Sequence, residues 1–181
     1  MFNGVSDVAE FIEAACRAAK QTGDGWTVCE FGSFVMHDHD PRPIVEKHGF
    51  VGYTGVDWRA GPGVDVVAMN RDALPLVGDG FALSLSLQAL EHDPDWRGTV
   101  RAMVAVLRPG GVVAVSVPAP GWPEHETDCA PDGGTYYENR TPTDIVEEIK
   151  TTGRCGEVVK CKIEPSTVQY RSRSLVIVRV E

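Results

Sequence analysis

The chain has 181 residues, of which 43% are hydrophobic and 24% charged, as is normal for a soluble globular protein. This length allows one sizeable core, so we expect a single domain over residues 1–181. The net charge of −9 argues against a nucleic-acid partner, because binding to a phosphate backbone needs a basic surface. The oligomeric state is not indicated by the sequence.

Hydropathy also argues against a membrane protein. No apolar run approaches the ~20 residues that span a bilayer. Residues 1–7 lack the basic and apolar regions of a secretory signal, so a cytoplasmic location is expected. The five cysteines are an odd number without CxxC spacing, which predicts buried free thiols rather than disulfides or a structural zinc site: Cys16, Cys29, Cys129, Cys155 and Cys161.

Helices and strands alternate in the first part of the chain. We expect a helix capped by Ser6 with an apolar stripe to Ala19, a strand over 26–31, a short helix over 41–48, and strands over 51–57 and 64–68. Only residues 58–63 separate the last two strands, whereas parallel neighbours normally need a dozen or more residues between them. Either the crossing is tight and irregular, which we prefer, or one strand is poorly formed.

The second part continues the alternation and ends differently. It contains a strand over 81–87, a helical stripe from Trp96 to Leu107 stopped by Pro109-Gly110-Gly111, a strand over 112–117, a helix over 145–150, and strands over 158–163 and 175–180. No helix separates the last two strands. The pattern predicts an α/β fold with a doubly wound, mostly parallel sheet and helices on both faces. Residues 119–140 form a long loop of the kind that builds a lid or substrate wall.

Four short segments suggest a known family. They are Glu30-Phe31-Gly32-Ser33, the strand that ends on Asp57, Leu90-Glu91-His92, and Arg108-Pro109-Gly110-Gly111. In order and spacing they resemble class I S-adenosylmethionine-dependent methyltransferases. The resemblance implies a Rossmann-like sheet with an antiparallel C-terminal strand, S-adenosyl-L-methionine as cofactor, and methyl transfer to a small molecule or metabolite. It is clearest over residues 26–118.

The carboxyl end of the second strand is the main candidate site. Rossmann-like sheets place there a carboxylate that accepts hydrogen bonds from both ribose hydroxyls of a nucleoside, the role we assign to Asp57. The alternative is a surface residue without a ligand. Trp58 is expected over the adenine face, or else it is a half-buried packing residue.

Glu30, Gly32 and Ser33 stand at the first motif of the family, which usually has two or three glycines. Here only Gly32 remains, which we expect to contact the methionine part of the cofactor. The pyrophosphate of NAD needs bare backbone N–H groups at a helix N-terminus, and G-x-G-x-x-G is absent, so a nicotinamide dehydrogenase is disfavoured. The reduced motif also motivates the rival reading, a non-catalytic binding or assembly module descended from a methyltransferase.

Two further strand ends complete the expected cofactor site. Met69 and Asn70 follow the third strand, where the family commonly places an acid for the adenine amino group. Asn70 can supply a carbonyl oxygen, or Asp72 can reach back, while a plain loop is equally consistent. Ser86 ends the fourth strand beneath the expected methyl-transfer position.

No catalytic residue is assigned from the sequence. His92 is a candidate base because its pKa can lie near neutrality, but a helix-start histidine bonded to backbone is the preferred reading. Many methyl transfers need no base, since the sulfonium is already an activated donor. His37-Asp38-His39-Asp40 and the pair His125 and Cys129 lack an evident set of three or four ligands, so no metal is expected.

Overall fold

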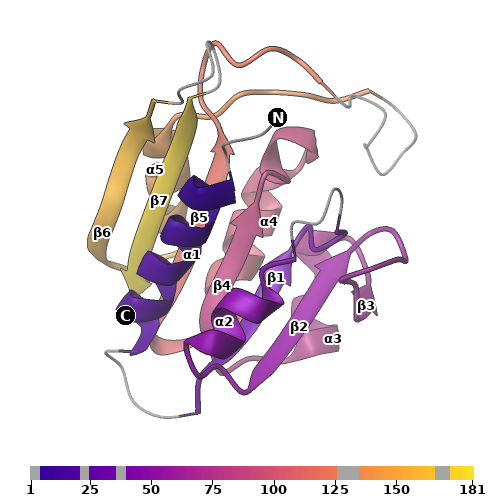
Figure 1. Cartoon of the computed structure of the whole chain (residues 1–181), viewed down its shortest axis with the longest axis vertical. Helices are drawn as coiled ribbons and strands as arrows, with labels where there is room; N and C mark the ends of the chain where they lie inside the picture. Colours follow the sequence, from indigo (N-terminus) through magenta and orange to yellow (C-terminus); the bar gives the residue numbers. More distant parts are fainter. Residues whose placement is uncertain (1–4, 21–24, 36–39, 126–134, 166–171) are drawn as a thin grey trace.

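The computed structural model describes residues 5–20, 25–35, 40–125, 135–165 and 172–181 (Figure 1). Its described helices are α1 (Val5–Ala19), α2 (Arg42–Lys47), α3 (Leu74–Val77), α4 (Trp96–Ala105) and α5 (Pro142–Thr151), with 3₁₀ turns η2 (Asn70–Asp72) and η3 (Leu90–His92). The strands are β1 (Thr27–Phe31), β2 (Gly52–Asp57), β3 (Val66–Val67), β4 (Phe81–Leu87), β5 (Leu107–Pro118), β6 (Cys155–Glu164) and β7 (Arg173–Val180).

All seven strands belong to one sheet, in the order β3-β2-β1-β4-β5-β7-β6. Strands β1 to β5 pair in parallel, and β7 lies antiparallel between β5 and β6. The predicted fold class is therefore confirmed, including the antiparallel C-terminal strand. The chain runs outward in one direction from β1 and in the other from β4, so the order reverses between these neighbours. Ligands of such sheets bind beside the carboxyl ends of the strands at this reversal.

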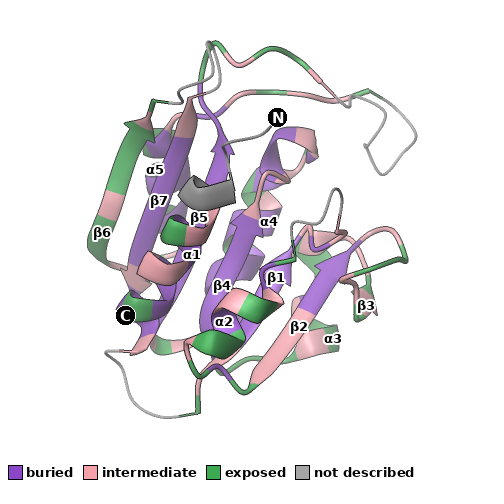
Figure 2. Ribbon diagram, in the orientation of Figure 1, coloured by how far each residue is buried: buried purple, intermediate pink, exposed green. Residues whose placement is uncertain are grey.

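Helices cover both faces of the sheet (Figure 1). On the face of α1 and α2, Phe11 and Ile12 pack in one cluster with Leu83. On the face of α4 and α5, Trp96 and Met103 belong to a second cluster. The central strands are buried along nearly their whole length (Figure 2), which explains their continuous apolar sequence. None of the described helices is long and apolar enough to cross a membrane.

The structure contains the tight crossing between β2 and β3 that we preferred from the sequence. The two strands are parallel, with Val56 opposite Val66 and Asp57 opposite Val67. No helix lies between them; instead Asp65 N donates to Gly55 O at 2.8 Å. The third strand is shorter than the predicted 64–68, because only two of its residues pair.

Three local predictions were wrong. Ser6 lies within α1, which begins at Val5, rather than before it. Leu107 does not end a helix: it starts β5, opposite Phe81. Pro109-Gly110-Gly111 lies within β5, where the register with β4 shifts and Gly110 has φ +77°. The extra residues form an irregularity in the strand that glycine tolerates. Helix α4 has already ended before this strand, at Ala105.

The described cysteines are free, as predicted, but not all are buried. Burial raises the pKa of the Cys16 and Cys29 thiols to about 12, so both are inert packing groups. Cys161 is exposed and Cys155 half-buried on β6. This corrects the expectation of buried thiols, because β6 is too exposed to bury the side chains of either face. Cys129 lies outside the described residues.

Candidate functional site

Gly32 directly follows β1, at the carboxyl edge of the sheet. Its N–H donates to Val56 O at 2.9 Å, and its φ is +77°, a region that favours glycine. A Cβ placed on Gly32 would overlap the Ala89 side chain after β4. The loops after β1 and β4 therefore touch at this residue, and any side chain here would disturb that junction first.

Asp57 ends β2 and is nearly buried, with 5% of its surface exposed. Its Oδ1 accepts a hydrogen bond from Arg59 N at 2.9 Å, and its Oδ2 accepts one from Phe34 N at 3.3 Å. Burial raises the pKa of the Asp57 carboxyl, while these N–H groups and the Arg59 guanidinium act in the opposite direction. Each carboxylate oxygen has a second lone pair, so each can accept a further hydrogen bond.

Aromatic rings lie beside this carboxylate. The Arg59 guanidinium lies 4.3 Å from the centroid of the Phe34 ring and 5.1 Å from that of Trp58. Trp58 is half-buried. Planar groups from two different loops thus meet at Arg59, whose Nε lies 4.0 Å from Asp57 Oδ1.

The loop after β1 is closed on one side by the β2–β3 crossing. Val35 N donates to Pro62 O at 2.9 Å. A Cβ on Gly55 would lie 2.6 Å from Ser33 Oγ, and a Cβ on Gly63 would overlap the Ser33 carbonyl oxygen. Ser33 is buried with its hydroxyl turned toward β2, and this hydroxyl has no hydrogen-bond partner among the described residues. Glycines of the neighbouring strand and loop, rather than of the first motif itself, permit this close approach.

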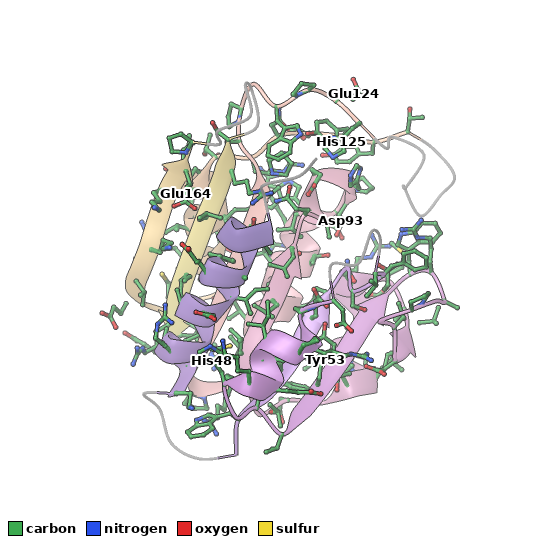
Figure 3. All side chains as sticks on the ribbon, viewed as in Figure 1. His48, Tyr53, Asp93, Glu124, His125 and Glu164 are labelled. Carbon is green, nitrogen blue, oxygen red and sulfur yellow. The ribbon has the colours of Figure 1, made fainter. Side chains whose placement is uncertain are left out.

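Glu30 lies inside β1 and is buried. The hydroxyl of Tyr53, labelled in Figure 3, donates a hydrogen bond to its carboxylate. Burial holds the pKa of Glu30 well above its usual range; the nearby charges of Asp40 and Asp57 act in the same direction and Arg42 opposes them. Glu30 is thus a buried residue of the site whose carboxyl group is hydrogen-bonded to Tyr53.

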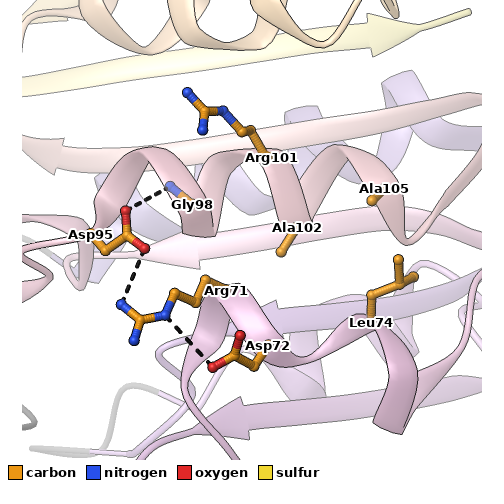
Figure 4. Close-up of a pocket in the computed structure, with 8 residues that line it drawn as sticks. All are labelled: Arg71, Asp72, Leu74, Asp95, Gly98, Arg101, Ala102 and Ala105. Carbon is orange, nitrogen blue, oxygen red and sulfur yellow. Dashed lines mark hydrogen bonds and ion pairs between the residues drawn. The ribbon is translucent and has the colours of Figure 1, made fainter.

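Met69 and Asn70 follow β3, and η2 begins at Asn70. Asn70 Oδ1 is buried without a hydrogen-bond partner among the described residues. The turn is fixed to α4, because Arg71 Nη1 lies 3.2 Å from Asp95 Oδ2 while Asp95 Oδ1 accepts from Gly98 N at 3.3 Å, capping the helix. Arg71, Asp95 and Gly98 line a pocket between η2, α3 and α4 (Figure 4). Arg71 pairs with Asp72 and Asp95 here, and the remaining charged residue of the lining, Arg101, pairs with Glu148 of α5, so we interpret this pocket as an anchor for η2.

Ser86 is fully buried near the end of β4, and its Oγ has no partner among the described residues. Gln88, just beyond the strand, has φ +55°, which is uncommon for a residue other than glycine. Its Nε2 donates to Ser116 Oγ at 3.1 Å and its N to Ser116 O at 2.8 Å. Such strain clusters at functional sites, and no sequence signal indicated it.

His92 lies in η3 and contacts the long loop. Its ring centroid is 5.6 Å from that of His125 and 5.5 Å from that of Tyr137. Burial raises the pKa of Tyr137, and the charges of Glu91 and Glu124 add to this shift. The sequence paired His125 with Cys129, which lies outside the described residues together with His37, Asp38 and His39; the structure instead brings His125 to His92.

The comparisons with known proteins concern the fold. No protein-family model matches the sequence, and no curated protein sequence matches it. The solved 1,6-didemethyltoxoflavin-N1-methyltransferase of Burkholderia thailandensis, with bound 1,6-didemethyltoxoflavin and S-adenosylhomocysteine, is 17% identical with a TM-score of 0.68, and the match covers 98% of this chain and 81% of that one. An S-adenosylmethionine-dependent methyltransferase of Mesorhizobium loti is 21% identical with a TM-score of 0.63, covering 97% and 100%. The [4+2]-cyclase SpnF is 13% identical with a TM-score of 0.65, covering 94% and 80%.

The fold of this chain is that of the class I S-adenosylmethionine-dependent methyltransferases, as the resemblance in the sequence implied. SpnF carries the same fold under the name of a cyclase, so the reaction must be argued from the site.

Proposed function

We propose that residues 1–181 form a single-domain, S-adenosyl-L-methionine-dependent methyltransferase that acts on a small molecule or metabolite. The observation that carries the proposal is the position of Asp57: a nearly buried carboxylate at the end of β2, beside the glycine turn after β1, in a sheet of methyltransferase order. In Rossmann-like sheets this position accepts hydrogen bonds from ribose hydroxyls.

The residues divide the cofactor between them. Asp57 accepts from both ribose hydroxyls, and Trp58 packs on the adenine ring. Asn70 Oδ1 accepts from the adenine amino group; as a buried acceptor without a described partner, it gains a hydrogen bond that it otherwise lacks. Gly32 lets backbone approach the methionine part, beside Glu30 and Ser33 at the same strand end, while Met69 lies with Asn70 after β3.

The bound cofactor supplies an activated methyl group on a sulfonium. The protein contributes alignment and exclusion of water. Ser86 and the strained Gln88 lie at the end of β4, beneath the expected transfer position. His92 lies just beyond them, and the loop over residues 119–140 supplies His125 and Tyr137 to the same region.

A small acceptor is supported by charge and by similarity. The net charge of −9 disfavours nucleic acid. The similar Burkholderia enzyme holds a small molecule, 1,6-didemethyltoxoflavin, next to S-adenosylhomocysteine. A cytoplasmic location belongs to the same proposal and rests on the sequence alone.

Binding of S-adenosylhomocysteine tests the proposal. We expect calorimetric titration to give clear binding to the wild-type chain. Asp57→Ala removes two charge-assisted hydrogen bonds, each worth about 1.5–3 kcal/mol, so affinity should fall by at least roughly tenfold. Asp57→Asn keeps one acceptor oxygen and should fall between the two.

Asp65→Ala is the matched control. Its carboxylate also accepts a backbone N–H, from Gly55 at 2.8 Å, and it pairs with Arg42 at 2.8 Å. The variant loses comparable hydrogen bonds in the same region without touching the proposed ribose site, so it should bind nearly as wild type. Equal affinities for all four proteins would refute the role of Asp57, and no binding at millimolar ligand would favour the non-catalytic module.

A further inference from the structure

A carboxylate and two imidazoles meet at the carboxyl edge of the sheet. Glu91, His92 and His125 each offer one ligand atom, and these atoms all lie within 4.8 Å of one another. Glu91 is fully buried and the His92 side chain is 12% exposed. Imidazole nitrogen together with carboxylate oxygen suits divalent first-row transition metals.

Two hydrogen bonds bring these side chains together. The long loop has two described arms, residues 119–125 and 135–140. Glu138 N, in the second arm, donates to Glu91 O at 2.9 Å, which ties this arm to η3. Asn139 Nδ2 donates to Trp122 O at 2.9 Å, which ties the two arms to each other. His125, in the first arm, is thereby held close to η3 although it is far away in the sequence.

One hydrogen bond selects the tautomer of His125. Its Nδ1 lies 3.1 Å from the carbonyl oxygen of Pro123. A carbonyl oxygen only accepts, so Nδ1 must carry the proton and Nε2 keeps its lone pair in the neutral ring. Metal-binding histidines usually donate their second N–H in this way, because it orients the ring and makes the ligand nitrogen more basic.

The ligand atoms are close but not yet at bonding separation. His92 Nε2 lies 4.0 Å from Glu91 Oε1. Metal–ligand bonds of about 2.0–2.1 Å at tetrahedral angles place neighbouring ligands roughly 3.3 Å apart. Side-chain movements of about 1 Å close this difference.

We propose that Glu91, His92 and His125 bind one divalent transition-metal ion and leave at least one coordination position open. Three protein ligands with an open position are typical of catalytic rather than structural metal sites. The cluster begins four residues after β4 ends at Leu87. If the proposed function holds, the open position faces the acceptor end of the site and suits an acceptor with an oxygen or nitrogen ligand.

Zinc binding tests the site without any S-adenosyl ligand, so its failure leaves the cofactor proposal untouched. Chelator-treated protein is titrated with Zn²⁺ against a chromophoric competitor. We expect one ion per chain for wild type and at least about tenfold weaker binding for His125→Ala and His125→Gln, the second of which keeps the side-chain volume. His48→Ala is the control, because His48 precedes β2 at the opposite edge of the sheet and pairs with Glu13.

Co²⁺ identifies the ligand atoms. Nitrogen and oxygen ligation gives d–d absorption without a thiolate charge-transfer band, and the d–d bands should be lost in His125→Ala and retained in His48→Ala. Equal Zn²⁺ affinity in all the proteins, absence of binding, or a thiolate band in wild type would each overturn the proposal, the last because it assigns the ion to a cysteine such as the exposed Cys161.

Discussion

The two halves of the sheet are stabilised in different ways. In β4, β5 and β7 the strands have 7, 12 and 8 residues and are buried along most of their length. In β2 and β3 they have 6 and 2 residues, and half of β2 is only partly buried (Figure 2). Residues from both halves form the candidate site. Those proposed to hold the nucleoside come from the half with the shorter strands, β2 and β3, which we call the thinner half; β4, β5 and β7 form the thicker half.

The thinner half depends on specific hydrogen bonds and glycine contacts. The Asp57 carboxylate accepts a backbone N–H from the loop after β1, and the Asp65 carboxylate accepts one from β2 itself, while Gly55 and Gly63 allow the loops to approach. The thicker half is stabilised by apolar burial. Removing buried side-chain volume lowers its stability, but no particular polar partner is required. Ligand-binding segments are generally drawn from the less stable parts of a fold.

The largest expected effect is in the thicker half. Leu85→Ala empties a fully buried position of β4 and should lower the free energy of unfolding by about 2–5 kcal/mol. Val67→Ala in β3, where the side chain is 56% exposed, should change it by no more than about 0.5 kcal/mol. Urea unfolding measures both. Similar losses for the two variants would contradict the contrast.

Gly32 lies where the two halves meet, and a smaller effect is expected there. Gly32→Ala combines an unfavourable positive φ with overlap on Ala89 and should cost about 1–3 kcal/mol by urea unfolding. Gly153→Ala is the matched control, because Gly153 has a similar φ of +73° but open space around its Cβ. It should cost less. Adding Ala89→Gly to Gly32→Ala should recover the difference; no recovery would mean that the backbone angle alone is responsible.

A pH-dependent effect is expected from Glu30→Gln, which keeps the shape of the side chain. Because the folded-state pKa of Glu30 is raised, the unfolded chain ionises first as the pH rises. The wild-type protein therefore loses stability between the unfolded and folded pKa values, and the variant lacks this loss.

Urea unfolding at several pH values measures this difference. The stability of Glu30→Gln relative to wild type should increase from about pH 4 toward pH 8. The same substitution at Glu147 on α5 is the control for an exposed carboxylate. A constant difference across the pH range would mean that Glu30 titrates normally in the folded protein.

Much of the fold could be predicted because it depends on local patterns. Continuous apolar runs such as 81–87 indicated strands covered on both faces, and the order of strands and helices indicated the doubly wound sheet. The position of Asp57 at a strand end followed from the same reading. Its assigned role, like those of Trp58 and Asn70, stays a prediction.

Other features depend on contacts between distant residues, which spacing does not show. Nothing local indicates that Tyr53 covers Glu30 or that His125 meets His92. The η2 turn and α3 were missed because each is too short for a periodic pattern. Gly61-Pro62-Gly63 was a usable signal: paired glycines in a short crossing mark a place where backbone approaches backbone, as happens at Ser33.

The exposed strand β6 has a consequence for solubility. It ends one side of the sheet and presents Val158, Val159 and Ile163, each more than two-fifths exposed, together with unpaired backbone groups that could recruit a strand from another copy. Two irregularities in its register with β7, around Val158, and the charges of Lys160 and Lys162 work against such pairing. At the other side, β3 is simply too short to act as a template. Irregular register and positive charge thus oppose pairing with another copy at β6, and the short length of β3 opposes it at the other edge of the sheet.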